Sequence, residues 1–549
     1  MSRSSMEAKI RAFRSRIAGF PAQDAVRGAQ ILGLIFWSLL PGCGPHPRML
    51  PYNLQVPIDR SLLRYPPGFA VQPYIRGLSA PTSMAWDPSD GSLLVAEGGN
   101  YDQEPRILAF HRDGRIETVY PYGQRLLIDI GRPRFEMYGP IGGMIVYKDR
   151  IYVSHRDENG LGRITAIDRH GGYRTVVANL PTQGDYSVTD LAIDPVQGRL
   201  FFGVGAATNS SVVGLDNWQW VQDHPKVHDL PLGRLYLRGY RFDSPNPFSG
   251  LFGPADIART GPFQPFNVSD QSEVEGKELP NAAIYSCSPD GGGIRVEAHG
   301  IRCPRGIAYN GAWFFFTNEG MELRGTRPVK NDPDALLRLI PAGGSGRPTW
   351  YGWPDYTTDL QPVYLDKFQP PQETIARTGY QRVLFVIDED RTIGDPKTVP
   401  LERATDSLVR GVFAPLSGAA KLDFAPVDGP FKPFARRAVV ALCGDRAPFD
   451  TSGYPIFQVG YKVVLVDWEH KKVEDFVSNT AGGPASRIDP KNLNLLERPV
   501  DVKFGPDGTL YILDAGRMQV RDGRDVYEPG TGQIFRLVPT SQPAMFHNP

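Results

Sequence analysis

Few residues of this chain could do metal or redox chemistry by themselves. The sequence has 549 residues, with four cysteines and nine histidines. They form no Cys-x-x-Cys pair and no His/Cys cluster with the spacing of zinc ligands, which argues against a transition-metal site. The 60 basic and 60 acidic residues cancel, which argues against nucleic acid or an anionic membrane surface as a partner. We therefore expect a small molecule as the partner.

Cys43 has a distinct chemistry because of the residues before it. Residues 1–28 are rich in Arg and Lys, and an apolar run follows at residues 29–40. This run is shorter than the roughly 20 residues of a membrane-spanning helix and suits the core of a signal peptide. Leu40-Pro41-Gly42-Cys43 resembles the lipobox of bacterial lipoproteins, although Pro at its second position is atypical. We predict that residues 1–43 are a signal peptide and that Cys43 is lipidated; an uncleaved anchor or plain secretion is the alternative.

Lipidation of Cys43 predicts where the protein lies. We expect it at the bacterial cell envelope, on its periplasmic or extracellular face, with the lipid as its contact with the membrane. The Pro-rich segment 44–67 predicts a stiff tether.

The remaining cysteines, Cys287, Cys303 and Cys443, are odd in number, so at least one thiol is free. The sequence leaves open whether Cys287 and Cys303 pair.

The elements that must position any site are repeated β-hairpins. Residues 81–97, 188–205 and 498–514 share one plan: an alternating strand, Asp-Pro or Gly-Pro leading to Gly, and a second apolar strand. Pro presets the backbone angle that opens such a turn, and Gly takes the positive angle that closes it. The 59 Gly, 51 Pro and 41% hydrophobic residues indicate short strands and turns rather than disorder.

Paired strands of this kind form six blocks along the chain, at residues 83–119, 140–180, 186–299, 305–344, 419–478 and from 498 onward. They predict an all-β fold, a six-bladed β-propeller over residues 68–540 with a tail at 541–549. A strand at 68–78 precedes the first block and the last block is one strand short, so we expect the two termini to complete one blade. A stacked sandwich is the competing all-β fold.

The third block is interrupted by an irregular insertion at residues 213–280, which is rich in Pro, Gly and aromatic residues. Its aromatic residues include Trp218 and Trp220. They either stack on a sugar at a pocket mouth or pack the long loop onto its blade. We favour the packing role.

On these segments the chain resembles a known family. The stretches PGFAVQPYIRGLSAPTSMAWDP, HGIRCPRGIAYNGAWFFFTNEG, GGSGRPTWYGWPDY and RPVDVKFGPDGTLYILDAG, in this order, look like the glucose/sorbosone dehydrogenases. The resemblance covers residues 66–540. It implies a six-bladed propeller that uses pyrroloquinoline quinone and calcium to oxidise a sugar, polyol or aldehyde, and an electron acceptor in the cell envelope.

The resemblance also implies cofactor residues. The quinone bears carboxylates, which the planar fork of Arg binds well. Arg302 and Arg498 match two cofactor-contacting arginines of the family, and Arg446 replaces a third cation if the alignment shifts by one residue. The backbone carbonyls of Gly320 and Met321 match the turn that holds calcium, a cation that prefers oxygen ligands.

The sequence departs from the family at the catalytic base. Tyr186 stands where family enzymes have the His that takes the hydroxyl proton. A phenol with a pKa of about 10 is a poor base near neutral pH, so Asp185 and His155 are the possible substitutes.

Two functions remain open on the sequence. The first is a lipid-anchored, quinone-dependent sugar, polyol or aldehyde dehydrogenase. The second is a catalytically inactive propeller that binds carbohydrate or protein at the cell envelope. A calcium-dependent lactone hydrolase is less favoured, since no ring of Asp, Asn and Glu ligands is recognisable.

Overall fold

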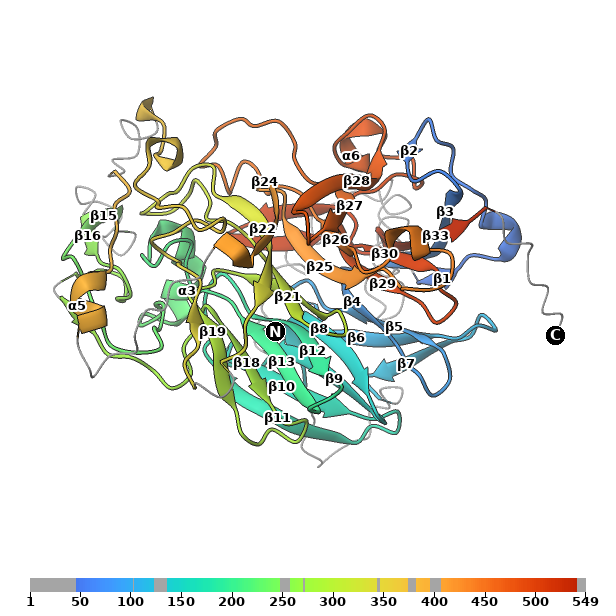
Figure 1. Cartoon of the computed structure of the whole chain (residues 1–549), viewed down its shortest axis with the longest axis horizontal. Helices are drawn as coiled ribbons and strands as arrows, with labels where there is room; N and C mark the ends of the chain where they lie inside the picture. The colour runs from blue at the N-terminus through green and yellow to red at the C-terminus, as the bar shows by residue number, and fades with distance from the viewer. Residues whose placement is uncertain are drawn as a thin grey trace, which may run out of the picture. The chain divides into compact units, whose positions relative to one another are not determined.

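The computed structural model describes residues 46–101, 103–122, 136–246, 257–269, 272–342, 346–373, 382–394 and 406–540. The predicted signal peptide, the predicted lipidation site Cys43 and the tail 541–549 lie outside the described residues. Within them the fold is a six-bladed β-propeller, as the sequence predicts. We number the blades by the position of their innermost strands along the chain (Figure 1).

The first three blades follow the chain. Blade 1 contains β4 (Pro81–Trp86), β5 (Leu93–Glu97), β6 (Arg106–Phe110) and β7 (Ile116–Tyr120). Blade 2 contains β8 (Tyr138–Tyr147), β9 (Arg150–Arg156), β10 (Gly162–Ile167) and β11 (Tyr173–Leu180). Blade 3 contains β12 (Val188–Asp194), β13 (Arg199–Val204), β18 (Ala283–Cys287) and β19 (Arg295–His299), with β23 (Thr349–Trp350) added in parallel at its edge.

The other three blades take strands from distant segments. Blade 4 contains β20 (Pro304–Tyr309), β21 (Phe314–Asn318), β22 (Pro333–Leu339) and β24 (Val409–Pro415). Blade 5 contains β25 (Ala419–Phe424), β26 (Ala438–Leu442), β27 (Lys462–Asp467) and β28 (Lys472–Asn479), with β2 (Leu63–Arg64) at its edge. Blade 6 contains β29 (Pro499–Phe504), β30 (Leu510–Asp514), β33 (Gly532–Pro539), β3 (Phe69–Leu78) and β1 (Arg48–Met49).

The ring closes where the sequence predicts it. Strand β3 pairs antiparallel with β33 along its length, from Phe69 opposite Pro539 to Leu78 opposite Gly532, so the two ends of the chain complete blade 6 (Figure 1). The innermost strands then pack side by side in the order β4, β8, β12, β20, β25, β29 and back to β4. This arrangement closes the ring of blades, an architecture that leaves only short, protected strand edges.

Each innermost strand has a shift in its pairing register near its first residues. In three of the blades, a side chain near this shift accepts a hydrogen bond from a backbone N–H of the next blade. The pairs are Met84 N to Asp501 Oδ2 at 2.9 Å, Met144 N to Ser83 Oγ at 3.1 Å and Ile307 N to Asp190 Oδ2 at 3.1 Å. These side chains link neighbouring blades at the propeller axis.

The predicted tether at residues 44–67 is wrong from Arg48 onward. Strand β1 pairs with β3 and strand β2 pairs with β28. Ile58 and Leu63 are 3% and 0% exposed in the apolar core between blades 5 and 6. Burial of such side chains outweighs the stiffness that Pro gives the segment, so it packs on the propeller.

The insertion at 213–280 packs onto the propeller. It carries η2 (Leu215–Asn217), α3 (Trp218–Asp223), β14 (Leu235–Tyr236), β15 (Phe242–Pro245), β16 (Ile257–Thr260) and β17 (Glu273–Val274). Trp220 is 8% exposed in an apolar cluster with Val221, which agrees with the packing role favoured above.

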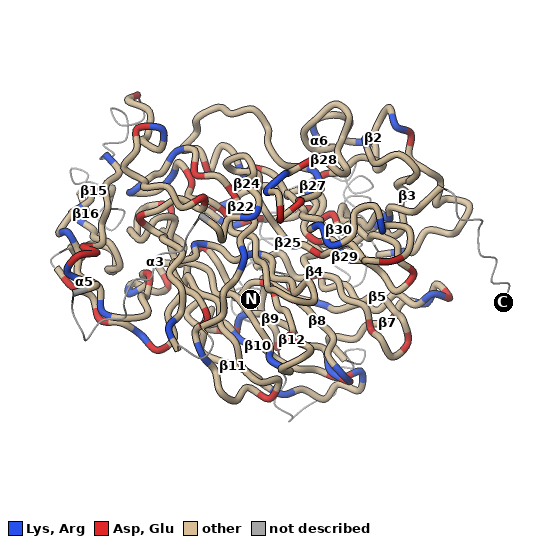
Figure 2. The backbone as a smooth tube through the Cα atoms, viewed as in Figure 1, with Lys and Arg blue, Asp and Glu red and all other residues tan. Residues whose placement is uncertain are grey.

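The remaining elements are short. They are η1 (Tyr52–Leu54), η4 (Asp366–Phe368), α5 (Glu389–Gly394), η5 (Asp406–Leu408), η6 (Lys432–Phe434), α6 (Ala485–Ile488), and the hairpin β31 (Met518–Arg521) and β32 (Arg524–Tyr527). Among the described residues, no helix is long and apolar enough to cross a membrane. Basic and acidic residues are interspersed over the traced chain (Figure 2).

Candidate functional site

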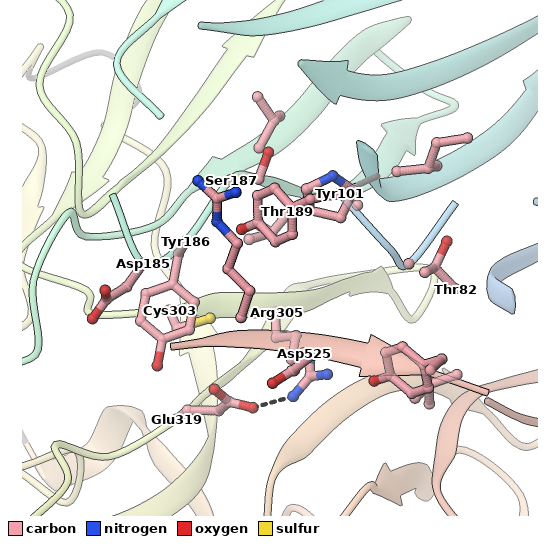
Figure 3. A pocket seen from close by; sticks show the side chains of 18 of the residues that line it. Thr82, Tyr101, Asp185, Tyr186, Ser187, Thr189, Cys303, Arg305, Glu319 and Asp525 are labelled. Carbon is pink, nitrogen blue, oxygen red and sulfur yellow. Dashed lines mark hydrogen bonds and ion pairs between the residues drawn. The ribbon is translucent and has the colours of Figure 1, made fainter. Parts of the chain in front are cut away.

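A pocket lies on the propeller axis, with a cavity volume of about 170 Å³. Every innermost strand contributes to its wall, through residues that include Thr82, Gly142, Thr189, Arg305, Lys421 and Val500. Loops above these strands add Tyr101, Asp185, Tyr186, Cys303, Glu319 and Arg446, and the β31–β32 hairpin adds Arg524, Asp525 and Tyr527. In Figure 3, Asp185, Tyr186, Arg305 and Glu319 lie around one space.

Tyr186 lies on the pocket wall immediately before β12. Its ring is 4.9 Å from the Arg302 guanidinium, and its hydroxyl is 3.5 Å from Glu322 Oε1. Burial raises the pKa of Tyr186 well above its usual value; Arg302 opposes this effect, and Glu322 adds to it. The phenol therefore stays protonated at neutral pH. This environment suits a hydrogen-bond donor better than the predicted proton acceptor.

Asp185 also lines the pocket. Its carboxylate accepts hydrogen bonds from Arg324 Nη2 at 2.5 Å and from Asn217 Nδ2 at 2.8 Å. Arg324 pairs with two further carboxylates, those of Asp216 and Glu322. Burial raises the pKa of Asp216 to about 6. Asp185 is thus a fixed acceptor in a buried cluster around one arginine.

Arg302 is buried beneath Tyr186 rather than exposed in the pocket. It is 1% exposed. Its Nε donates to Asn209 O at 3.1 Å, its Nη1 donates to Gly320 O at 2.6 Å, and its Nη2 forms an ion pair with Glu322 Oε1 at 3.2 Å. The guanidinium therefore joins loops of blades 3 and 4.

Arg498 has a similar structural role in blades 5 and 6. It is 8% exposed, and it donates to Cys443 O at 3.1 Å and Asp445 O at 2.8 Å. Its guanidinium lies 5.1 Å from the Tyr461 ring. Neither Arg498 nor Arg302 is on the described pocket wall.

Arg446 is the one predicted cofactor residue that lines the pocket. Its Nε donates to Asp525 Oδ1 at 2.9 Å, which ties a loop of blade 5 to strand β32. The structure therefore brings Tyr186, Asp185 and Arg446 together and leaves the other two predicted arginines behind the wall.

The pocket does not fit a cofactor with three carboxylates. Its wall has four basic residues, Arg305, Lys421, Arg446 and Arg524, and three acidic residues, Asp185, Glu319 and Asp525. Most of these charges are already paired: Arg305 with Glu319, Arg446 with Asp525, Asp185 with Arg324, and Lys421 with Asp190 at 3.4 Å. A triply negative ligand needs a surplus of cations, and this wall has a surplus of one.

The predicted calcium turn also fits poorly. The carbonyl of Gly320 accepts the Arg302 guanidinium, and the N–H of Met321 donates to Asp332 Oδ2 at 2.7 Å. A cation at the Gly320 oxygen would lie beside a buried positive charge. Among the described residues, no three or more His, Cys, Asp and Glu side chains are grouped so that they could hold a metal.

The other candidate base, His155, lies in the core of blade 2. It is 0% exposed, and its ring nitrogens contact Arg156 O at 2.6 Å and Thr165 Oγ1 at 2.9 Å. Burial lowers its pKa to about 4. His155 is not on the described pocket wall.

All three described cysteines are free, so Cys287 and Cys303 do not pair. Cys303 lines the pocket, and burial raises the pKa of its thiol well above the usual value. It is therefore a neutral thiol at physiological pH.

Several site residues were missed in the sequence, namely Arg305, Glu319, Arg324, Arg524 and Asp525. Glu319 follows strand β21 directly, in a turn that reads as an ordinary polar turn. Arg305 and Arg524 face the axis because each lies on a strand that reaches it. Their partners are distant in the chain, so no local spacing indicates them.

No protein-family model and no curated protein matches the sequence. Solved structures do match. A putative oxidoreductase (glucose dehydrogenase) from Thermus thermophilus has 17% identity and a TM-score of 0.41, covering 86% of this chain and 100% of its own. The soluble aldose sugar dehydrogenase of Escherichia coli has 13% identity and a TM-score of 0.45, covering 86% and 99%. A gluconolactonase from Xanthomonas campestris has 10% identity and a TM-score of 0.32, covering 90% and 95%.

Proposed function

We propose that the axial pocket binds one small hydroxyl-bearing molecule, of the sugar, polyol or aldehyde class, in a propeller that does not use the quinone. The observation that carries the proposal is the composition of the wall, in which paired charges and hydroxyl groups surround a cavity of about 170 Å³. Lipidation of Cys43 would place this binding protein at the cell envelope.

The wall offers what a polyhydroxylated ligand requires. Asp185 and Glu319 supply carboxylate acceptors, and Tyr186, Thr82 and Thr189 supply hydroxyl groups. The acceptors are held by arginines, so they are oriented before the ligand arrives. Ile141, Val188 and Val500 give the wall an apolar side for ligand C–H groups. A few fixed polar groups on a partly apolar wall are typical of small-molecule sites.

The size of the cavity supports a single small ligand. Sites for drug-sized ligands have volumes of about 300–1,000 Å³, and this pocket is smaller, at about 170 Å³. It matches one sugar-sized molecule better than a cofactor and a substrate together.

The competing candidate is a quinone-dependent dehydrogenase that passes electrons to an acceptor in the envelope. One observation favours it: Tyr186 and Arg446, at positions that the family resemblance marks, line the same pocket as Asp185, the possible substitute base. Pyrroloquinoline quinone, when bound, would accept the hydride. In that case Arg446 would have to leave Asp525 to contact a carboxylate.

Calorimetric titration of the purified full-length protein tests the proposal. D-glucose, D-sorbitol and D-glyceraldehyde are the probes, and Asp185→Asn is the site variant. We expect binding of at least one probe and a loss of about 10- to 100-fold in the variant, since a hydrogen bond to a charged group contributes about 1.5–3 kcal/mol. Asp149→Asn is the matched control, because Asp149 is an 85% exposed carboxylate in the β8–β9 turn.

A second variant distinguishes loss of binding from loss of the fold. Thr82→Leu adds bulk to the pocket wall without removing an ion pair, and it should also weaken binding. Absence of binding for all three probes and for the acidic sugars tested below would overturn the proposal. Saturable binding of pyrroloquinoline quinone with calcium, followed by dye reduction in the presence of a probe, would establish the dehydrogenase instead.

A further inference from the structure

Arg524 differs from the other basic residues of the pocket wall. Arg305, Arg446 and Lys421 each form an ion pair. For Arg524, on strand β32, the described part of the chain supplies no carboxylate within ion-pair distance. The carboxylate of its sequence neighbour, Asp525, is used by Arg446.

Aromatic rings hold the Arg524 side chain in place. Its guanidinium lies 4.9 Å from the Tyr101 ring and 5.3 Å from the Trp220 ring. Tyr101 lines the pocket as well, and Trp220 comes from helix α3 of the insertion. The Nε of Arg524 is buried, and no described residue accepts a hydrogen bond from it. Cation–π contacts of this kind fix a guanidinium without neutralising it.

A second arginine reinforces the positive charge. Arg156 lies 5.0 Å from the Tyr101 ring and 4.7 Å from the Trp220 ring, so two guanidinium groups share one aromatic pair. Arg156 is 2% exposed. Its Nη2 donates to the carbonyl of Thr182 at 2.6 Å, whereas its Nε and Nη1 are buried and have no hydrogen-bond partner among the described residues. Arg156 is not on the described pocket wall, so it adds positive charge behind Arg524 rather than a donor to the ligand.

We infer that the ligand of the axial pocket carries a single carboxylate beside its hydroxyl groups, as a sugar acid does, and that this carboxylate binds Arg524. The inference rests on the proposed function. A carboxylate would satisfy the planar fork of Arg524 and match the surplus of one positive charge on the wall.

The test compares acidic and neutral sugars by calorimetry with the full-length protein. We expect D-gluconate or D-glucuronate to bind at least about 10-fold more tightly than D-glucose, since a hydrogen bond to a charged group contributes about 1.5–3 kcal/mol. Arg524→Gln should remove this preference, so that D-glucose and the two acids bind with affinities within a few-fold of one another. Arg524→Lys keeps the charge without the fork and should keep part of the preference.

Arg521→Gln is the matched control. Arg521 lies opposite Arg524 in the register of the β31–β32 hairpin. Its side chain is exposed and is not part of the pocket wall, so Arg521→Gln removes the same charge as Arg524→Gln. Equal affinity of the wild-type protein for D-glucose and both acids would overturn this inference and leave the proposed function standing. An equal loss in Arg521→Gln and Arg524→Gln would also overturn it. Absence of binding for every sugar would overturn the proposed function itself.

Discussion

Arginine side chains at the propeller axis serve two physical roles that the residue type alone does not distinguish. Arg302 and Arg498 donate to main-chain carbonyls and are enclosed by loops. Arg524 faces the pocket and is held by aromatic rings. Most donors of the first two are satisfied by these carbonyls within the protein, as buried donors usually are. The third leaves its donors for a ligand.

Tyr186 gives a prediction at the residue scale. Because burial keeps its phenol protonated, Tyr186→Phe should leave the pH dependence of ligand binding between pH 6 and 9 unchanged. The affinity should fall by no more than about 10-fold, since a neutral hydrogen bond contributes about 0.5–1.5 kcal/mol. Calorimetry at three pH values measures both effects.

Tyr173→Phe, on the outer strand β11, is the control for Tyr186→Phe. An inflection in the wild-type profile that disappears in Tyr186→Phe alone would show that Tyr186 ionises. The role of catalytic base would then be restored to it.

At the scale of elements, strand β33 holds the two ends of the chain together. It pairs with β3 on one side and with β30 on the other, so an N-terminal strand lies within a blade made otherwise from the C-terminal region. Each blade contributes its innermost strand to the pocket wall. A substitution that weakens the pairing of β3 with β33 should therefore also disturb the pocket, because the inner strands pack side by side in a ring.

Phe535 gives a prediction at this scale. It is 0% exposed on β33, in the apolar core between blades 5 and 6. Phe535→Ala should lower the free energy of unfolding by about 3–5 kcal/mol, because it removes buried apolar surface and leaves a cavity. Urea unfolding followed by tryptophan fluorescence measures the change.

Arg536→Ala is the neighbouring control, since Arg536 is partly exposed on the same strand. We expect it to change the free energy of unfolding by at most about 1 kcal/mol. Equal effects of the two substitutions would mean that the β3–β33 contact does not depend on the apolar core.

At the scale of the whole molecule, the propeller encloses many carboxyl groups. Burial raises the pKa of Asp332 to about 8, and the pKa values of Asp229 and Asp334 to about 7. These groups retain their protons in the folded state at pH values where the unfolded chain, with Asp pKa values of about 3.9, has lost them. The folded state thus binds more protons between these pKa values.

Stability should therefore fall as the pH rises from 5 to 8, and level off above pH 8. We expect thermal unfolding at fixed ionic strength to show a higher midpoint at pH 5 than at pH 8. Asp332→Asn should reduce this slope because the amide does not titrate, whereas the exposed Asp149→Asn should not. A midpoint that rises across this range would contradict the raised pKa values.

The sequence by itself determined the architecture. Turns such as Gly505-Pro506-Asp507-Gly508 fix hairpins through local backbone preferences, and their repetition predicts the blades and the closure by β3 and β33. The tether predicted for residues 48–67 was wrong, because the burial of Ile58 and Leu63 depends on a surface formed by two distant blades.

Only the tertiary structure decided the site. Tyr186, Asp185 and Arg446 reach the pocket, whereas Arg302 and Arg498 lie behind its wall. Whether an arginine faces a ligand depends on which carbonyls and carboxylates surround it, and these come from other blades. Hairpin propensity is a local property of the chain, but charge compensation depends on residues that the fold brings together, such as Arg446 and Asp525, which are 79 positions apart.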